Sequence, residues 1–232
     1  MSVSVSGVVA YGIDEDRAQT PEAPWTALRR RFGGRYPIDP HGFDPQLQDM
    51  LAPFLGLGVR VDVEGAEHLP ERGPALLVCN RALGLVEPLA LTVAVRASIR
   101  RRLRIVGVPD LPLVGDALHK LGGIGAYHGD LAALLRAGHL AAVPLGPTWL
   151  ARGVGTPPLG LLVAALGYPV IPAAVVPGGP LGLPIKPWRV VIGAPLDIDP
   201  VVGQYVPGDP LGAAELAEAA RAGVRALVER PN

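Results

Sequence analysis

Residues 76–91, "LLVCNRALGLVEPLAL", decide the fold class. The apolar run that ends at Asn80 predicts a strand covered on both faces, and Glu87-Pro88 predict the start of a helix. Enzymes of this class place functional groups in the loop after such a strand. Here that loop begins with Arg81 and continues with apolar residues and glycine. A guanidinium stays protonated in proteins, so Arg81 cannot act as a general base.

The same alternation of strand and helix patterns continues on both sides of this stretch. It predicts strands over 59–65, 74–80, 103–108, 140–146, 169–176 and 189–198, with helices over 43–56, 87–97, 111–122, 130–138, 159–167 and 210–230. Asp44 and Asp130 are the expected helix caps. The prediction is one α/β domain over residues 41–232, with a central mixed, mostly parallel sheet flanked by helices. Residues 1–40 are expected to form an irregular N-terminal arm.

Composition excludes several classes of function. The 232 residues carry a formal net charge of zero, which argues against bulk binding of nucleic acid. Cys79 is the only cysteine, so no disulfide framework or cysteine-based metal site is expected, and a reducing compartment is favoured. The longest apolar run, residues 160–176, is broken by Gly167, Pro169 and Pro172, and it is too short to span a bilayer. We expect a cytoplasmic protein without a signal peptide or cofactor.

Several segments, taken in order, resemble motifs of a known family. They are "VCNR" (78–81), "LGGIGAYH" (121–128), "AVPLGPTW" (142–149), "GYPVIPAAVV" (167–176) and "VVIGAPLDI" (190–198). The ordered set resembles the phospholipid/glycerol acyltransferase family, whose members are lysophosphatidate-acyltransferase-like, over residues 59 to about 200. The resemblance implies an acyltransferase-type α/β fold and a thioester donor, either acyl-CoA or acyl-carrier protein.

The ionisable residues of the family motifs are replaced in this sequence. The family histidine falls on Arg81, or on Ala82 if the loop has gained one residue. The family aspartate falls on Val86, or on Glu87 under the same insertion. In that family the histidine is thought to act as a general base that the aspartate orients. The resemblance therefore implies a degenerate site without the usual His-Asp pair.

Three further motif positions have also changed. The third-motif glutamate falls on Leu145, its Thr-Arg pair falls on Pro147-Thr148, and the second-motif arginine falls on His128. Losing the glutamate predicts an apolar pocket floor, which suits a hydrophobic ligand. We expect the substrate to contact Asn80, Arg81, Leu145 and Thr148.

Glu87 and His128 are the candidate catalytic residues, and each has a structural alternative. Glu87 is expected near a helix N-terminus, where a carboxylate is favourable without any catalytic role. Histidine titrates near neutral pH, but His128 could equally be exposed or paired with Asp130. Arg81 could bind a phosphate or carboxylate, or it could be solvated or paired with Glu87.

The arginine-rich segment "RASIRRRLR" (96–104) also has two interpretations. It is expected either to be a solvated surface or, together with Arg29–Arg31, to provide peripheral contact with anionic lipid at the inner membrane face. Three functions remain open: an acyltransferase with an altered site, a non-catalytic lipid-binding protein, and an enzyme repurposed for another reaction on a hydrophobic substrate. Each involves a hydrophobic or acyl-thioester ligand and no nucleic acid.

Overall fold

The computed structural model describes residues 17, 29, 38–58, 60–80, 86–108, 114–145, 162, 165–178, 187–197 and 210–230. Within these residues, seven strands form one sheet in the order β1-β7-β6-β2-β5-β3-β4. The strands are β1 (Val61–Glu64), β2 (Ala75–Asn80), β3 (Leu103–Val106), β4 (Gly123–Ile124), β5 (Leu140–Leu145), β6 (Val170–Val176) and β7 (Trp188–Ile192). The prediction that the strands near 74–80, 103–108, 140–146 and 170–176 share one sheet is confirmed.

The sheet is mixed, and its parallel part is the larger one. Strands β6, β2, β5, β3 and β4 run parallel, whereas β7 is antiparallel to β6, and β1 is parallel to β7. Central β2 is buried on both faces up to Asn80, as its continuous apolar run predicted. Edge strand β1 alternates between half-buried and exposed residues, which matches its alternating sequence.

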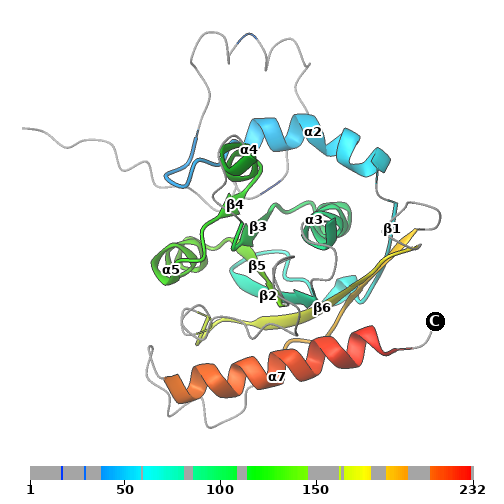
Figure 1. Ribbon diagram of the computed structural model, residues 1–232, viewed down its shortest axis with the longest axis vertical. Coiled ribbons are helices and arrows are strands. Elements are labelled where there is room, and N and C mark those ends of the chain that lie inside the picture. The colour runs from blue at the N-terminus through cyan, green and yellow to red at the C-terminus, as the bar shows by residue number, and fades with distance from the viewer. Residues whose placement is uncertain are drawn as a thin grey trace, which may run out of the picture.

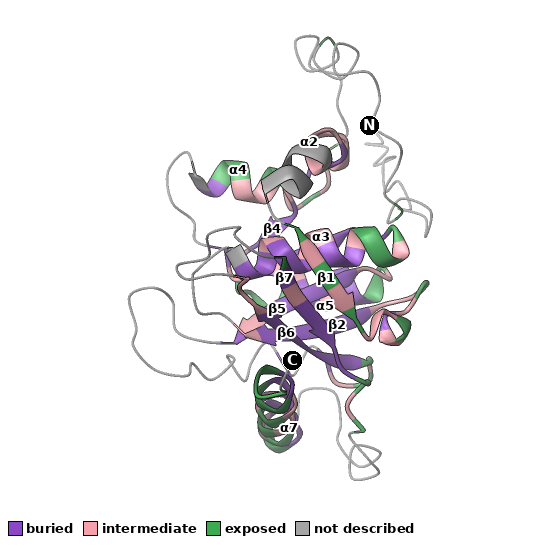
Figure 2. Cartoon of the chain, turned by 90° about the vertical axis from the view of Figure 1, so that its right-hand side faces the viewer, coloured by how far each residue is buried: buried purple, intermediate pink, exposed green. Residues whose placement is uncertain are grey.

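Helices cover both faces of the sheet. The helices of the described residues are α2 (Pro45–Gly58), α3 (Val86–Ile99), α4 (Val114–Lys120), α5 (His128–Arg136) and α7 (Pro210–Val228), with a short 3₁₀ turn η2 at Ala66–His68. One apolar cluster joins α3 to the sheet, and a second joins α5 and α7 to the opposite face. Figure 1 shows α3 above the sheet and α7 beneath it, and Figure 2 shows how burial concentrates in the strands between them. The predicted α/β fold is confirmed.

The two predicted helix caps have different outcomes. Asp44 caps α2, because its Oδ1 accepts a hydrogen bond of 2.8 Å from the backbone N–H of Leu47. Asp130 does not cap α5: the helix begins two residues earlier at His128, and its N-cap residue Tyr127 makes no side-chain cap hydrogen bond. Asp130 instead lies 3.8 Å from the ring of His41.

The arginine-rich segment is largely internal, so the expectation of a solvated or membrane-facing surface is wrong for most of it. Arg101, Arg102 and Arg104 are all buried. Arg101 donates hydrogen bonds to the carbonyl oxygens of Pro70, Gly73 and Gly138. Buried guanidinium groups with this many acceptors have a structural role, because each would be costly to bury without partners.

Three other arginines of this segment, Arg96, Arg102 and Arg104, hold the N-terminal part of the domain against the sheet. Arg96 and Arg102 both bind Asp49 in α2, each at 2.5 Å. Arg104 binds Asp39 and stacks over the ring of Phe43 at 4.4 Å from its centroid. We call residues 38–44, which carry Asp39 and Phe43, the strap. The rest of the expected N-terminal arm, apart from Arg17 and Arg29, lies outside the described residues.

None of the described helices is both long enough and apolar enough to cross a membrane.

Candidate functional site

The carboxyl ends of the five parallel strands lie along one edge of the sheet, where α/β proteins usually bind their ligands. Strands β2 and β5 are neighbours, and their last residues, Asn80 and Leu145, are register partners. The sheet therefore brings two of the predicted site residues together. The other two predicted substrate contacts, Arg81 and Thr148, lie outside the described residues.

Asn80 has a structural role that the sequence did not reveal. Its Nδ2 donates to the carbonyl oxygen of Val175 at 2.8 Å, and its Oδ1 accepts from the N–H of Val175 at 2.7 Å. The side-chain amide thus extends the pairing of β2 with β6 by a further pair of hydrogen bonds. This pairing fixes the point at which the chain leaves β2 and enters the loop of Arg81.

Glu87 lies in the first turn of α3, directly after that loop, and its side chain is completely buried (0% exposed). The parallel order of the strands places this helix start at the same edge as Asn80. A carboxylate there interacts favourably with the positive end of the helix dipole. Both interpretations of Glu87, as a helix-terminus carboxylate and as a reacting group, therefore remain compatible with its position.

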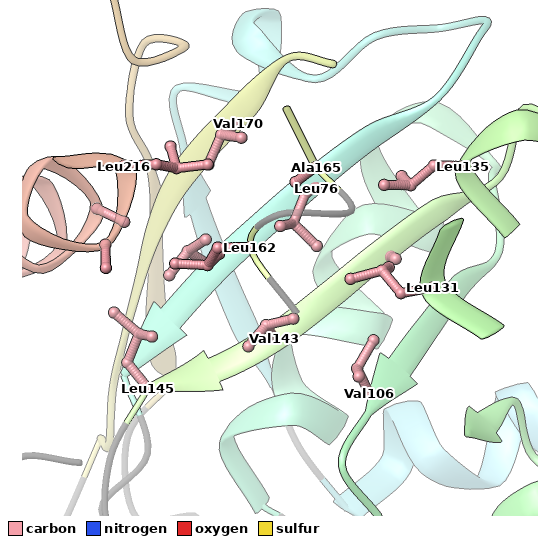
Figure 3. Close-up of a cluster of buried hydrophobic side chains, with 14 of the residues drawn as sticks. Leu76, Val106, Leu131, Leu135, Val143, Leu145, Leu162, Ala165, Val170 and Leu216 are labelled. Carbon is pink, nitrogen blue, oxygen red and sulfur yellow. The ribbon is translucent and has the colours of Figure 1, made fainter. Parts of the chain in front are cut away.

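Leu145 belongs to the hydrophobic core as well as to this edge. It is 5% exposed and packs in the cluster that α5 and α7 cover, on the same side of β5 as Val143 and near Leu162 (Figure 3). Helix α3, which carries Glu87, covers the opposite face. Leu145 and the start of α3 therefore flank the edge from two sides of the sheet.

His128 lies at the same edge but is not adjacent to Asn80. It is exposed and begins α5, which follows β4. The sheet order puts β4 three strands from β2, which corresponds to roughly 14 Å between strand axes. Of the two alternatives proposed for His128 without catalysis, the structure shows the exposed one, and the carboxylate of Asp130 lies 3.8 Å from Nδ1 of His41.

Sequence reasoning did not single out the region around His41. This residue lines two cavities near the β3–β4 side of the sheet. A signal was available in the segment "IDPHGFDP" (38–45), whose two Asp-Pro pairs are typical of turns and helix starts. Only residues 38–40 of this segment fall in the predicted irregular arm, whereas Asp44-Pro45 are the predicted start of a helix.

Comparisons with known proteins support the fold. No protein-family model matches the chain. The solved structure of a 1-acyl-sn-glycerophosphate (LPA) acyltransferase, PlsC, from Thermotoga maritima superposes with a TM-score of 0.55 and covers 90% of each chain at 17% sequence identity. The protein has an acyltransferase-like fold. At this level of identity the likeness concerns the fold alone.

Curated proteins from mycobacteria that match the chain carry the name "uncharacterized protein". One from Mycobacterium leprae (strain TN) is 41% identical over 127 residues, which are 50% of this chain and 35% of that protein. Those from Mycobacterium tuberculosis (strain H37Rv) and Mycobacterium bovis are 38% identical over 139 residues, 55% of this chain and 39% of each relative. The match thus spans little more than a third of the length of these relatives.

Proposed function

We propose that this protein binds an acyl chain or a similar hydrophobic group at the carboxyl edge of β2 and β5, and that its chemistry is acyltransferase-like. The observation that carries this proposal is the fold, which resembles that of an acyltransferase over 90% of the chain. The ordered motifs around Asn80, Leu145 and Val170–Val176 support the same conclusion. Ligand binding at the carboxyl ends of parallel strands is the general rule for such sheets.

In the catalytic form of this proposal, Glu87 serves as the base. The acceptor hydroxyl attacks the carbonyl carbon of an acyl thioester, so that a C–O bond forms and the C–S bond breaks. The proton passes from the hydroxyl to the carboxylate of Glu87 and then to the leaving thiolate. The support for this role is the position of Glu87, buried at the start of α3 where the motif aspartate is expected under a one-residue insertion. Arg81 would hold an anionic end of the substrate.

A second candidate function is acyl binding without turnover. Among the described residues, β2, β5 and the first turn of α3 contain no histidine. His128 is exposed and three strands away from β2. A general base typically contributes a factor of about 10² to 10⁴ to the rate. We therefore expect transfer from acyl-CoA to lysophosphatidate to be absent or very slow.

Two measurements on the same purified protein distinguish these functions. The first is binding of a fluorescent fatty-acyl probe, and the second is release of free thiol from long-chain acyl-CoA with lysophosphatidate as acceptor. If the protein is an enzyme, Glu87→Gln should lower turnover about 100-fold or more while probe binding is kept. Glu87→Asp should restore part of the rate. Glu64→Gln, at an exposed position of β1, is the matched control.

Probe binding without turnover would establish the second candidate. Turnover that depends on neither Glu87 nor His128 would exclude the proposed base. A protein that neither binds the probe nor releases thiol would overturn the proposal as a whole.

A further inference from the structure

A cavity of about 320 Å³ lies at the opposite edge of the sheet from the candidate site. Arg102, which precedes β3, and His139, which precedes β5, line it. Because β5 is six residues long, its two ends are roughly 17 Å apart. The cavity is therefore separate from the edge that carries Asn80 and Leu145.

The sheet topology explains why space remains there. Strand β4 pairs only with Ile105 and Val106, so within the described residues it leaves the amino half of β3 without a strand on that side. The strap and the start of α2 cover this half instead, and the last turns of α5 form the facing wall. The apolar lining comes from Pro40, Phe43 and Pro45 on one side and from Ala133, Leu134 and Ala137 on the other.

The charged residues of the wall are paired with one another. Arg104 binds Asp39, and Arg102 binds Asp49, in each case at 2.5 Å. Within the lining, two guanidinium groups and two carboxylates cancel in charge; Arg96, which also binds Asp49, lies outside the lining. An anionic ligand would have to compete with a carboxylate, and a cationic ligand with a guanidinium, at partly or fully buried pairs whose disruption is costly. The lining therefore favours a ligand without net charge.

The wall formed by the strap is held in place before any ligand arrives. Oδ1 of Asp39 accepts hydrogen bonds of 2.8 Å from the backbone N–H groups of His41 and Phe43. Oδ2 of the same residue binds Arg104, whose guanidinium lies over the Phe43 ring. A preformed wall reduces the ordering cost of binding.

We propose that this cavity is a binding site for an uncharged, largely apolar small molecule. Its volume lies at the small end of the range for ligand pockets, so it suits one or two small ring systems or a short chain and not a whole phospholipid. His41, Gln46 and His139 supply the polar groups of the lining, next to which a hydroxyl, amine or carbonyl of the ligand would lie. This site goes beyond the proposed function and does not depend on it.

The charge requirement can be tested with two dyes that share one skeleton. N-phenyl-1-naphthylamine is uncharged, and 8-anilino-1-naphthalenesulfonate adds a sulfonate to the same rings. We expect saturable fluorescence enhancement with the uncharged dye. Ala137→Trp, at an exposed position on the cavity wall, should weaken its affinity by about tenfold or more, because the indole occupies the space. The matched control is Arg136→Trp, which adds the same side chain to an exposed neighbouring position that does not line the cavity.

Ala133→Phe provides a second narrowing variant from the same wall, and urea unfolding shows whether each variant is folded. The proposal is overturned if the uncharged dye does not bind, or if both narrowing variants bind it as the parent does. It is also overturned if the sulfonated dye binds the parent protein as tightly as the uncharged dye does and binds Ala137→Trp more weakly. The site would then accept an anion. The proposal is supported if both narrowing variants bind the uncharged dye more weakly while Arg136→Trp binds it as the parent protein does.

Discussion

At the scale of single residues, Asp49 joins two helices to the start of a strand. Its two carboxylate oxygens bind Arg96 of α3 and Arg102 next to β3, and Asp49 itself belongs to α2. Asp49 and Arg102 are both buried. Removing one member of a buried ion pair leaves the other charge without compensation, which typically costs more than the pair contributes when intact.

We therefore expect Asp49→Ala to lower the free energy of unfolding by about 3–5 kcal/mol. Urea unfolding followed by circular dichroism measures this. Glu71→Ala, at an exposed turn, is the control and should change stability by less than about 0.5 kcal/mol. A loss of under about 1 kcal/mol for Asp49→Ala would show that these charges are solvated and that the ion pairs contribute little.

At the scale of elements, the turn between β1 and η2 depends on a glycine. Gly65 has a φ of 74°, and a Cβ built there would lie 2.0 Å from the carbonyl oxygen of Ile192 at the end of β7. The close approach follows directly after the stretch Val61–Glu64, along which β1 pairs in register with β7. Gly73 has a similar φ of 81° but has no atom within 4 Å of the corresponding position.

These two glycines form a matched pair for mutation. Gly73→Ala should cost about 1–2 kcal/mol, because alanine is strained in the left-handed region. Gly65→Ala should cost a further 1–3 kcal/mol or so, because the end of β7 must move to admit the methyl group. Thermal or urea unfolding of the two variants gives the difference directly. If both variants lose the same free energy of unfolding, the end of β7 moves away from the added methyl group without cost.

At the scale of the whole molecule, the strap continues the domain beyond the predicted boundary at residue 41. Asp39 lies on the N-terminal side of that boundary, yet it binds Arg104, which is 1% exposed. The backbone N–H of Asp44 also donates to the carbonyl oxygen of Lys120, so the strap joins the end of α4 as well. A domain that begins at residue 41 would lack the carboxylate that neutralises Arg104.

We expect a truncated chain that begins at Ile38 to be more stable than one that begins at His41, by about 3–5 kcal/mol. The difference is large for three residues because it includes a buried ion pair and the two backbone hydrogen bonds that Asp39 accepts. Urea unfolding of the two purified chains measures it. If both chains unfold at the same urea concentration, the strap is not part of the folded unit.

The sequence alone was sufficient for features that depend on near neighbours along the chain. Strands and helices were predicted because a pattern of period 2 or 3.6 lies within a few consecutive residues. The helix cap at Asp44 and the burial of Cys79 also depend on residues that are close in the sequence, and both are confirmed. The ordered motifs, taken together, pointed to the acyltransferase-like sheet, although the same motifs do not establish an activity.

The tertiary structure decided the features that depend on partners far away in the chain. Arg104 and Asp39 are 65 residues apart, and Asn80 and Val175 are 95 residues apart. A run of arginines has the same local pattern whether it faces water or a buried carboxylate. Because charged side chains are usually exposed, the sequence predicted a surface for this segment. The sheet order likewise separates His128 from Asn80 and brings Leu145 to it. Whether a charged or polar side chain can be buried depends on the groups that other segments place beside it, and only the folded chain determines those groups.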